Sequence, residues 1–226
     1  MILKNIFLIS LVLITMNTGC SGATKNKAQE KDTTNMGIDL TTVNLSKDLE
    51  KILKLTAFEP NRCEWSDQFT AQRTTEVNLF SLGSIALNKT YRINNFDVPN
   101  NSYVSFVPEK EGSNTIMTIH AKYRYLSNDL DIISQLKENF GEPELMNDED
   151  SVNTFKDFNN YIWAKLPNGS TLIVSLFSEG VAYVEGEESI KINTALIYVF
   201  NDKTEINYYN GQNSTVIEKL TKRFSY

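Results

Sequence analysis

Residues that could carry chemistry are scarce in this sequence. Its 226 residues include one histidine and two cysteines, Cys20 and Cys63. A single histidine excludes any site built from two or more imidazoles, and two cysteines cannot form the disulfide framework of a small secreted protein. The phosphate-binding loop, the dinucleotide-binding glycine pattern and the serine-hydrolase elbow are also missing. The sequence therefore predicts no cofactor and no metal site.

Charge and composition exclude two further classes of protein. Acidic residues outnumber basic ones, 28 against 22, so the net charge is −6. A protein that holds nucleic acid by neutralising its phosphates would carry the opposite sign. Apolar residues make up 41% of the chain, which excludes a wholly disordered protein. A body of about 180 residues buries roughly 70% of its unfolded surface and needs no disulfides.

The N-terminus has the pattern of an export signal. Lys4 provides a positive charge, and residues 6–14 form an apolar run. This run is too short to cross a hydrocarbon core of about 30 Å as a helix. Small residues follow it at positions 18–22. A charged start, a short apolar core and then small residues together predict a secretory signal.

Thr18, Gly19 and Cys20 resemble the lipobox of bacterial lipoproteins. The resemblance implies that residues 1–19 are removed and that Cys20 becomes the first mature residue, with acyl chains on its sulfur and its amine. Because one acyl chain binds a membrane only marginally, a lasting anchor needs two or three. We therefore expect the protein in the cell envelope, anchored to the inner or outer membrane and facing the periplasm or the cell surface. Cleavage after Ala23 by an ordinary signal peptidase is the alternative.

The segment that follows the signal predicts a flexible tether. Residues 21–35 are polar, alternate in charge and lack aromatic and branched aliphatic side chains. Such a segment cannot bury enough apolar surface to offset its chain entropy. Fully extended, it would span at most about 50 Å. The sequence thus divides into a signal over 1–19, a lipidated cysteine with its tether over 20–40, and a single domain over 41–226.

Apolar and polar residues alternate in several parts of the body, which predicts strands. The clearest strand covers 115–125, where one face is expected to carry Met117, Ile119, Ala121, Tyr123 and Tyr125. Further strands are predicted over 103–107, 161–166, 171–177, 190–200 and 204–209. Asn168 and Gly169, between two apolar runs, are typical of a hairpin turn.

Three segments have the spacing of helices. The best defined follows Ser127 or Asn128 as the N-cap and ends at Gly141. Shorter helices are predicted after Ser46 and after the capping box that begins at Thr215. Strands that outnumber helices indicate an α+β domain, mainly an antiparallel sheet with two or three helices packed on one face.

Few side chains remain as candidates for a catalytic site. His120 could act as a general base, although a solvated histidine on the polar face of its strand is the simpler interpretation. Cys63 could act as a nucleophile only if His120 came within hydrogen-bond reach; otherwise it is a small buried hydrophobe. Carboxylates cluster at 148–150 and 185–188. They could bind calcium, but solvated loop charge explains them more simply.

Aromatic residues are the remaining candidates for a binding surface. Trp65, Trp163, Tyr208 and Tyr209 could stack on sugars or anchor a protein partner. Aromatic side chains in strands belong more often to the core.

The sequence predicts a membrane-anchored envelope lipoprotein that is not an enzyme and that binds an envelope protein or glycan. Two alternatives stay open. The protein could be an immunity or inhibitor lipoprotein that neutralises an envelope-targeting toxin, because an acidic surface complements a basic enzyme. It could also be a hydrolase that uses Cys63 or carboxylates.

Overall fold

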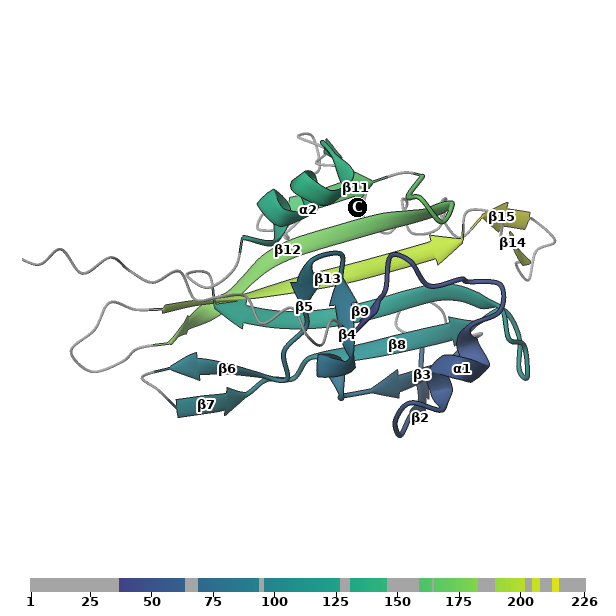
Figure 1. Cartoon of the computed structure of the whole chain (residues 1–226), viewed down its shortest axis with the longest axis horizontal. Helices are drawn as coiled ribbons and strands as arrows, with labels where there is room; N and C mark the ends of the chain where they lie inside the picture. Colours follow the sequence, from purple (N-terminus) through teal and green to yellow (C-terminus); the bar gives the residue numbers. More distant parts are fainter. Residues whose placement is uncertain are drawn as a thin grey trace, which may run out of the picture. The chain divides into compact units, whose positions relative to one another are not determined.

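A computed structural model describes residues 37–63, 69–93, 96–126, 131–145, 159–163, 165–182, 190–201, 205–207 and 213–215. Their main element is an antiparallel sheet of eight strands (Figure 1). In spatial order its strands are β10 (Glu144–Leu145), β11 (Asn159–Trp163), β12 (Ser170–Ala182), β13 (Ile190–Asn201), β9 (Ile116–Leu126), β8 (Tyr103–Pro108), β3 (Thr70–Thr74) and β2 (Glu59–Arg62). The predicted signal and most of the predicted tether lie outside the described residues.

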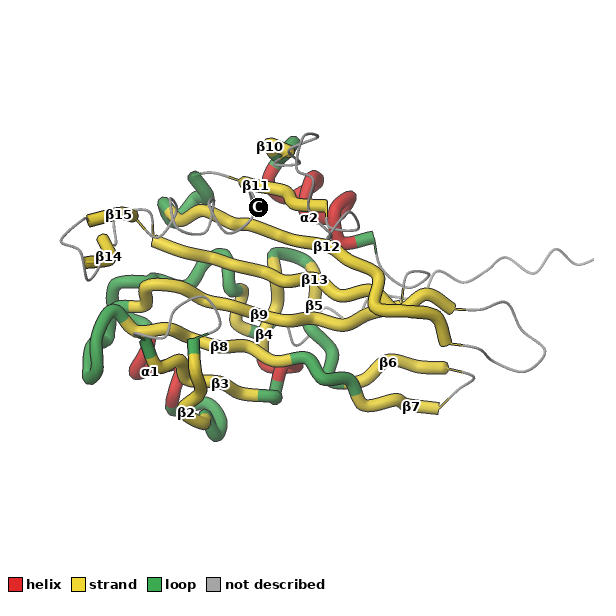
Figure 2. Tube along the Cα trace, turned by 180° about the vertical axis from the view of Figure 1, so that it is seen from behind, coloured by secondary structure: helices red, strands yellow, loops and turns green. Residues whose placement is uncertain are grey.

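Smaller elements complete the described part of the chain (Figure 2). One small sheet joins β1 (Ile38–Asp39), β4 (Phe80–Leu82) and β5 (Ile85–Ala86). Two others pair β6 (Thr90–Ile93) with β7 (Phe96–Pro99) and β14 (Glu205–Asn207) with β15 (Asn213–Thr215). The helices are α1 (Leu49–Leu53), α2 (Ile132–Phe140) and a 3₁₀ turn at Val77–Leu79.

The predicted α+β class is wrong, because the described part of the chain is mostly β-sheet. Its two α-helices have only five and nine residues. The apolar spacing after Ser46 supports little more than one turn of helix. Of the predicted C-terminal helix only Thr215 is described, and it ends β15.

The helix caps also differ from the prediction. Ser46 does not cap α1; the N–H of Glu50 donates to Asn114 Oδ1 at 2.7 Å, from the loop before β9. The cap of α2 is Asp131, whose Oδ1 accepts from Ser134 N at 3.1 Å. Ser127 and Asn128 lie outside the described residues. The predicted end of this helix at Gly141 is confirmed.

The predicted hairpin between the two apolar runs is confirmed. Strands β11 and β12 pair antiparallel on either side of Asn168 and Gly169. Asn168 Oδ1 accepts from Ser170 N at 3.1 Å and from Ser170 Oγ at 2.6 Å. Gly169 has a φ of 79°, a conformation that glycine adopts without steric cost. The turn residues therefore set the register between β11 and β12.

Apolar side chains pack on both faces of the eight-stranded sheet. On one face, named here the helix face, sheet residues pack with Leu49 and Ile52 of α1 and with Ile132 and Leu136 of α2. The opposite face, named the far face, carries a second core cluster: Cys63, Ala71, Val107, Met117, Ile162, Ile173, Tyr198 and Phe200. Residues that a one-sided sheet would expose to water are therefore buried as well.

The predicted face of the strand over 115–125 is wrong at one residue, Met117. Ile119, Ala121, Tyr123 and Tyr125 belong to the helix-face cluster, but Met117 belongs to the far face. The ladder between β8 and β9 shifts here, because Val107 pairs with Thr118 while the next residue pairs with Ile116. This leaves one extra residue in β9. Such a bulge changes which face the following side chains occupy.

Candidate functional site

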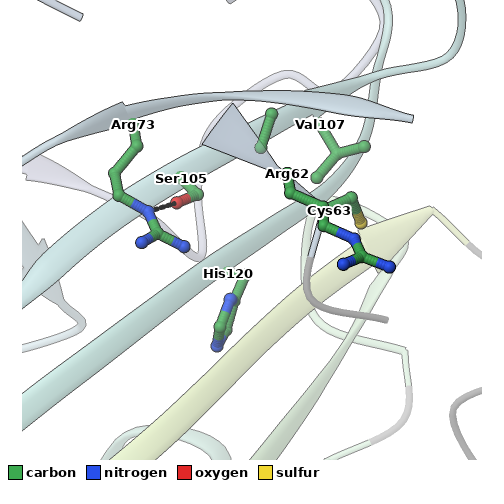
Figure 3. A pocket seen from close by; sticks show the side chains of 7 residues that line it. Arg62, Cys63, Arg73, Ser105, Val107 and His120 are labelled. Atoms are coloured by element: carbon green, nitrogen blue, oxygen red, sulfur yellow. Dashed lines mark hydrogen bonds between the residues drawn. The ribbon is translucent and has the colours of Figure 1, made fainter. Parts of the chain in front are cut away.

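The far face brings together the two residues that could have formed a nucleophile–base pair. A small pocket there is lined by Arg62, Cys63, Ala71, Arg73, Ser105, Val107 and His120 (Figure 3). Cys63 follows β2 at one end of the sheet, and His120 lies in the middle of β9. No spacing in the sequence indicates that they share a pocket. The pairings β2–β3, β3–β8 and β8–β9 bring them there.

His120 is held by aromatic rings on two sides. Its imidazole stacks on the ring of Tyr198 with the centroids 4.5 Å apart and the planes 6° from parallel. The edge-on ring of Tyr103 lies 5.5 Å away. The residue is 2% exposed, so the interpretation as a solvated histidine is wrong. The prediction missed this burial because it took the polar face of the strand to be exposed to solvent.

Arg73 extends this row of side chains. Its guanidinium carbon lies 3.8 Å from the centroid of the Tyr103 ring, and its Nε donates to Ser105 Oγ at 3.1 Å. A cation over an aromatic face is held by the ring quadrupole. Arg73, Tyr103, His120 and Tyr198 therefore form a continuous row of contacts across β3, β8, β9 and β13.

The pocket offers no space for a reaction between Cys63 and His120. It has no room for a water molecule, whereas a nucleophile and a base must both approach a reacting atom to about 3 Å. In Figure 3 the imidazole extends away from the sulfur of Cys63. Cys63 itself is buried in the far-face cluster. The geometry is that of a packed core with polar members.

Of the predicted aromatic candidates, the structure describes only Trp163. Trp163 is 3% exposed, and its indole Nε1 donates to the carbonyl oxygen of Gly141 at 2.8 Å, where it holds the end of α2. Trp65, Tyr208 and Tyr209 lie outside the described residues. The lipidation candidate Cys20 and the carboxylates at 148–150 and 185–188 also lie outside them.

Sequence reasoning missed a charged cluster at the other end of the far face. Named here the Glu179 cluster, it comprises Lys122 and Arg124 of β9, Glu179 of β12 and Thr194 of β13. Glu179 Oε2 forms an ion pair with Arg124 Nη2, and Oε1 lies 3.3 Å from Lys122 Nζ. Thr194 Oγ1 donates to the same Oε1 at 2.6 Å. Alternation places Lys122 and Arg124 on one face, but nothing local points to Glu179 as their partner.

The electrostatics of this cluster favour an ionised carboxylate. Burial raises the pKa of Glu179, but the hydrogen bonds from Thr194 and Arg124 and the charges of Lys122 and Arg124 outweigh burial, so the pKa is lowered overall. The register of β12 shifts between Ser178 and Gly180, which leaves Glu179 without a Cα partner on β13. Phe177 pairs with Thr194, and alternation places residue 179 on the same face as residue 177.

Comparison with known proteins finds no matching family model, no similar curated protein and no similar solved structure. Within the described ranges, no three His, Cys, Asp or Glu side chains converge as metal ligands. None of the helices described is long and apolar enough to cross a membrane.

Proposed function

We propose that this protein is a binding module without catalytic chemistry of its own, held at the bacterial cell envelope by lipid on Cys20. The observation that carries the proposal is the packing of His120. Histidine is the side chain that most often serves as a general base near neutral pH, and the one histidine of this chain is fixed between Tyr198 and Tyr103. A residue in that position stabilises a core.

The lack of space in the pocket beside Cys63 supports a binding role over hydrolysis at this residue. A thiol nucleophile needs a base in reach, an accessible sulfur and space for an acyl group. Cys63 is buried, and its pocket has no room for water. The immunity or inhibitor alternative belongs to the same class of binding proteins, so the identity of the captured partner decides it.

Partner capture tests the binding role. Full-length protein is crosslinked in membranes, and excess untagged protein competes for the partner. The Cys63→Ser/His120→Asn double variant serves as the matched protein without thiol and imidazole. We expect the same partner, competed to the same extent, for both proteins. Treating the folded wild type with a thiol-alkylating reagent gives a second readout: because Cys63 is buried, we expect it to stay unmodified and capture to stay unchanged. No competed partner with several crosslinkers, or a partner processed only by the wild type, would overturn the proposal.

The anchor has a separate test. Cells are labelled with a fatty-acid analogue, and Cys20→Ala is compared with Cys63→Ala. We expect label on the wild type and on Cys63→Ala and none on Cys20→Ala, because only residue 20 follows the lipobox-like residues. Label that persists in Cys20→Ala, or an unlabelled wild type, would contradict the anchor and leave the binding role to be judged by capture.

A further inference from the structure

The Glu179 cluster is unbalanced in charge, because one carboxylate faces two cations. Lys54–Glu50 and Lys89–Glu76 are pairs of one cation with one carboxylate, and both are well exposed. In the Glu179 cluster two cations share one carboxylate. The side chains are 29% exposed for Lys122, 24% for Arg124 and 15% for Glu179. Among the described residues, this cluster therefore holds one positive charge in excess, within reach of solvent, on a chain whose net charge is −6.

Hydrogen-bond donors also exceed acceptors in this cluster. The single carboxylate receives Thr194 Oγ1, Arg124 Nη2 and the ammonium group of Lys122. Arg124 Nε is itself buried and finds no acceptor among the described residues. Guanidinium and ammonium groups donate and never accept, so the unused capacity is entirely of the donor type. A ligand that brings acceptor oxygens and negative charge would complement it.

The backbone holds the cationic residues in place. The amide N–H of Arg124 donates to Ser102 Oγ at 3.0 Å, and its carbonyl oxygen accepts from Asn100 Nδ2 at 3.4 Å. Strand β9 lies between β13 and β8 in the sheet. A binding group that is positioned before its ligand arrives loses less entropy on binding. The cluster is therefore preorganised, although it is partly open to solvent.

We infer that the Glu179 cluster is a recognition site for an oxyanion, a carboxylate or a phosphate, carried by the binding partner. The inference rests on the proposed binding function and names the chemistry that the partner must present. Lys122 and Arg124 supply charge and donors. Glu179 holds them apart and competes with the ligand for the same two groups.

This competition predicts an effect that a purely structural ion pair would not give. Replacing Glu179 by glutamine removes the competing charge and keeps the shape of the side chain, so oxyanion binding should tighten. Replacing Lys122 by glutamine should weaken it. Partly exposed ion pairs correspond to changes of about threefold in affinity. Lys54→Gln, a cation in an exposed one-to-one pair, is the matched control and should change nothing.

The test is a titration of the full-length chain, purified in non-ionic detergent and labelled with ¹⁵N-arginine. The sequence has five arginines, and Arg124→Lys identifies the Arg124 signal. Sodium phosphate and sodium acetate are added separately, with ionic strength held constant by sodium chloride. We expect a saturable shift of the Arg124 Nε–H signal, with its midpoint lowered about threefold in Glu179→Gln and raised about threefold in Lys122→Gln.

The two titrants distinguish the sources. A response to phosphate alone identifies a phosphorylated ligand, and a response to acetate identifies a carboxylate. No saturable shift with either anion, or a midpoint raised by Glu179→Gln, would overturn the inference. If Glu179→Gln does not fold, the comparison of wild type with Lys122→Gln decides. Failure here would leave partner capture unchanged, so it is distinguishable from failure of the binding role.

Discussion

Replacing Trp163 by phenylalanine tests whether this tryptophan is structural or part of a ligand platform. The variant keeps a ring in the helix-face core and removes the indole N–H that donates to the Gly141 carbonyl. The lost hydrogen bond costs about 1 kcal/mol, and the smaller ring leaves a gap that costs about 1 kcal/mol more. We expect the free energy of unfolding to fall by about 2 kcal/mol.

Urea denaturation followed by far-UV circular dichroism measures this loss. Hydrogen exchange at the end of α2 provides a local readout, because the carbonyl that Trp163 holds lies directly after that helix. Tyr161→Phe, on the same strand and half-buried, is the matched control and should change stability by less than about 0.5 kcal/mol. An unchanged denaturation midpoint in Trp163→Phe, together with weaker partner capture, would refute the structural role and restore Trp163 as a binding residue.

Four further predictions concern pH and backbone conformation. The pKa of Glu179 is lower in the folded protein than its unfolded value near 4.5, so the ionised carboxylate stabilises the fold fully above that pH. This stabilisation is lost as the pH falls through the lower pKa of the folded protein. Urea unfolding between pH 7 and 3 should therefore show a loss of stability in the wild type and a smaller loss in Glu179→Gln. Burial, with the charge of Asp131 adding to it, raises the pKa of Tyr125 from 10.0 to about 12, so absorbance titration should show a late-ionising phenol, and stability should decrease between those two pH values. Lys165 has a φ of 60°, so Lys165→Gly should raise the free energy of unfolding by about 1 kcal/mol, whereas Lys165→Val should lower it. A Cβ at Gly37 would lie 2.3 Å from the carbonyl oxygen of Leu79, so Gly37→Ala should lower the melting temperature, and an unchanged value would argue against the β1–β4 pairing.

The far face shows how tertiary context changes the meaning of one residue. In the strand pattern, His120 alternates with apolar residues and so appears to face water. The structure buries it at 2% exposure against Tyr198, its direct neighbour across the β13–β9 ladder. The pattern of a single strand cannot reveal whether the other face of its sheet is covered. The fold class was wrong for a different reason, because the α-helices of the described residues are short and strands dominate.

The sequence alone determined those features that depend on neighbouring residues. The asparagine–glycine turn at 168–169, the end of α2 at Gly141 and most of the alternation along β9 follow from local backbone preferences and side-chain period. Only the tertiary structure decided that a bulge moves Met117 to the other face, that Cys63 and His120 share a closed pocket, and that Glu179 joins Lys122 and Arg124. These features depend on strand register and on partners far apart in the chain, and burial and charge pairing are properties of the assembled sheet, not of any one segment.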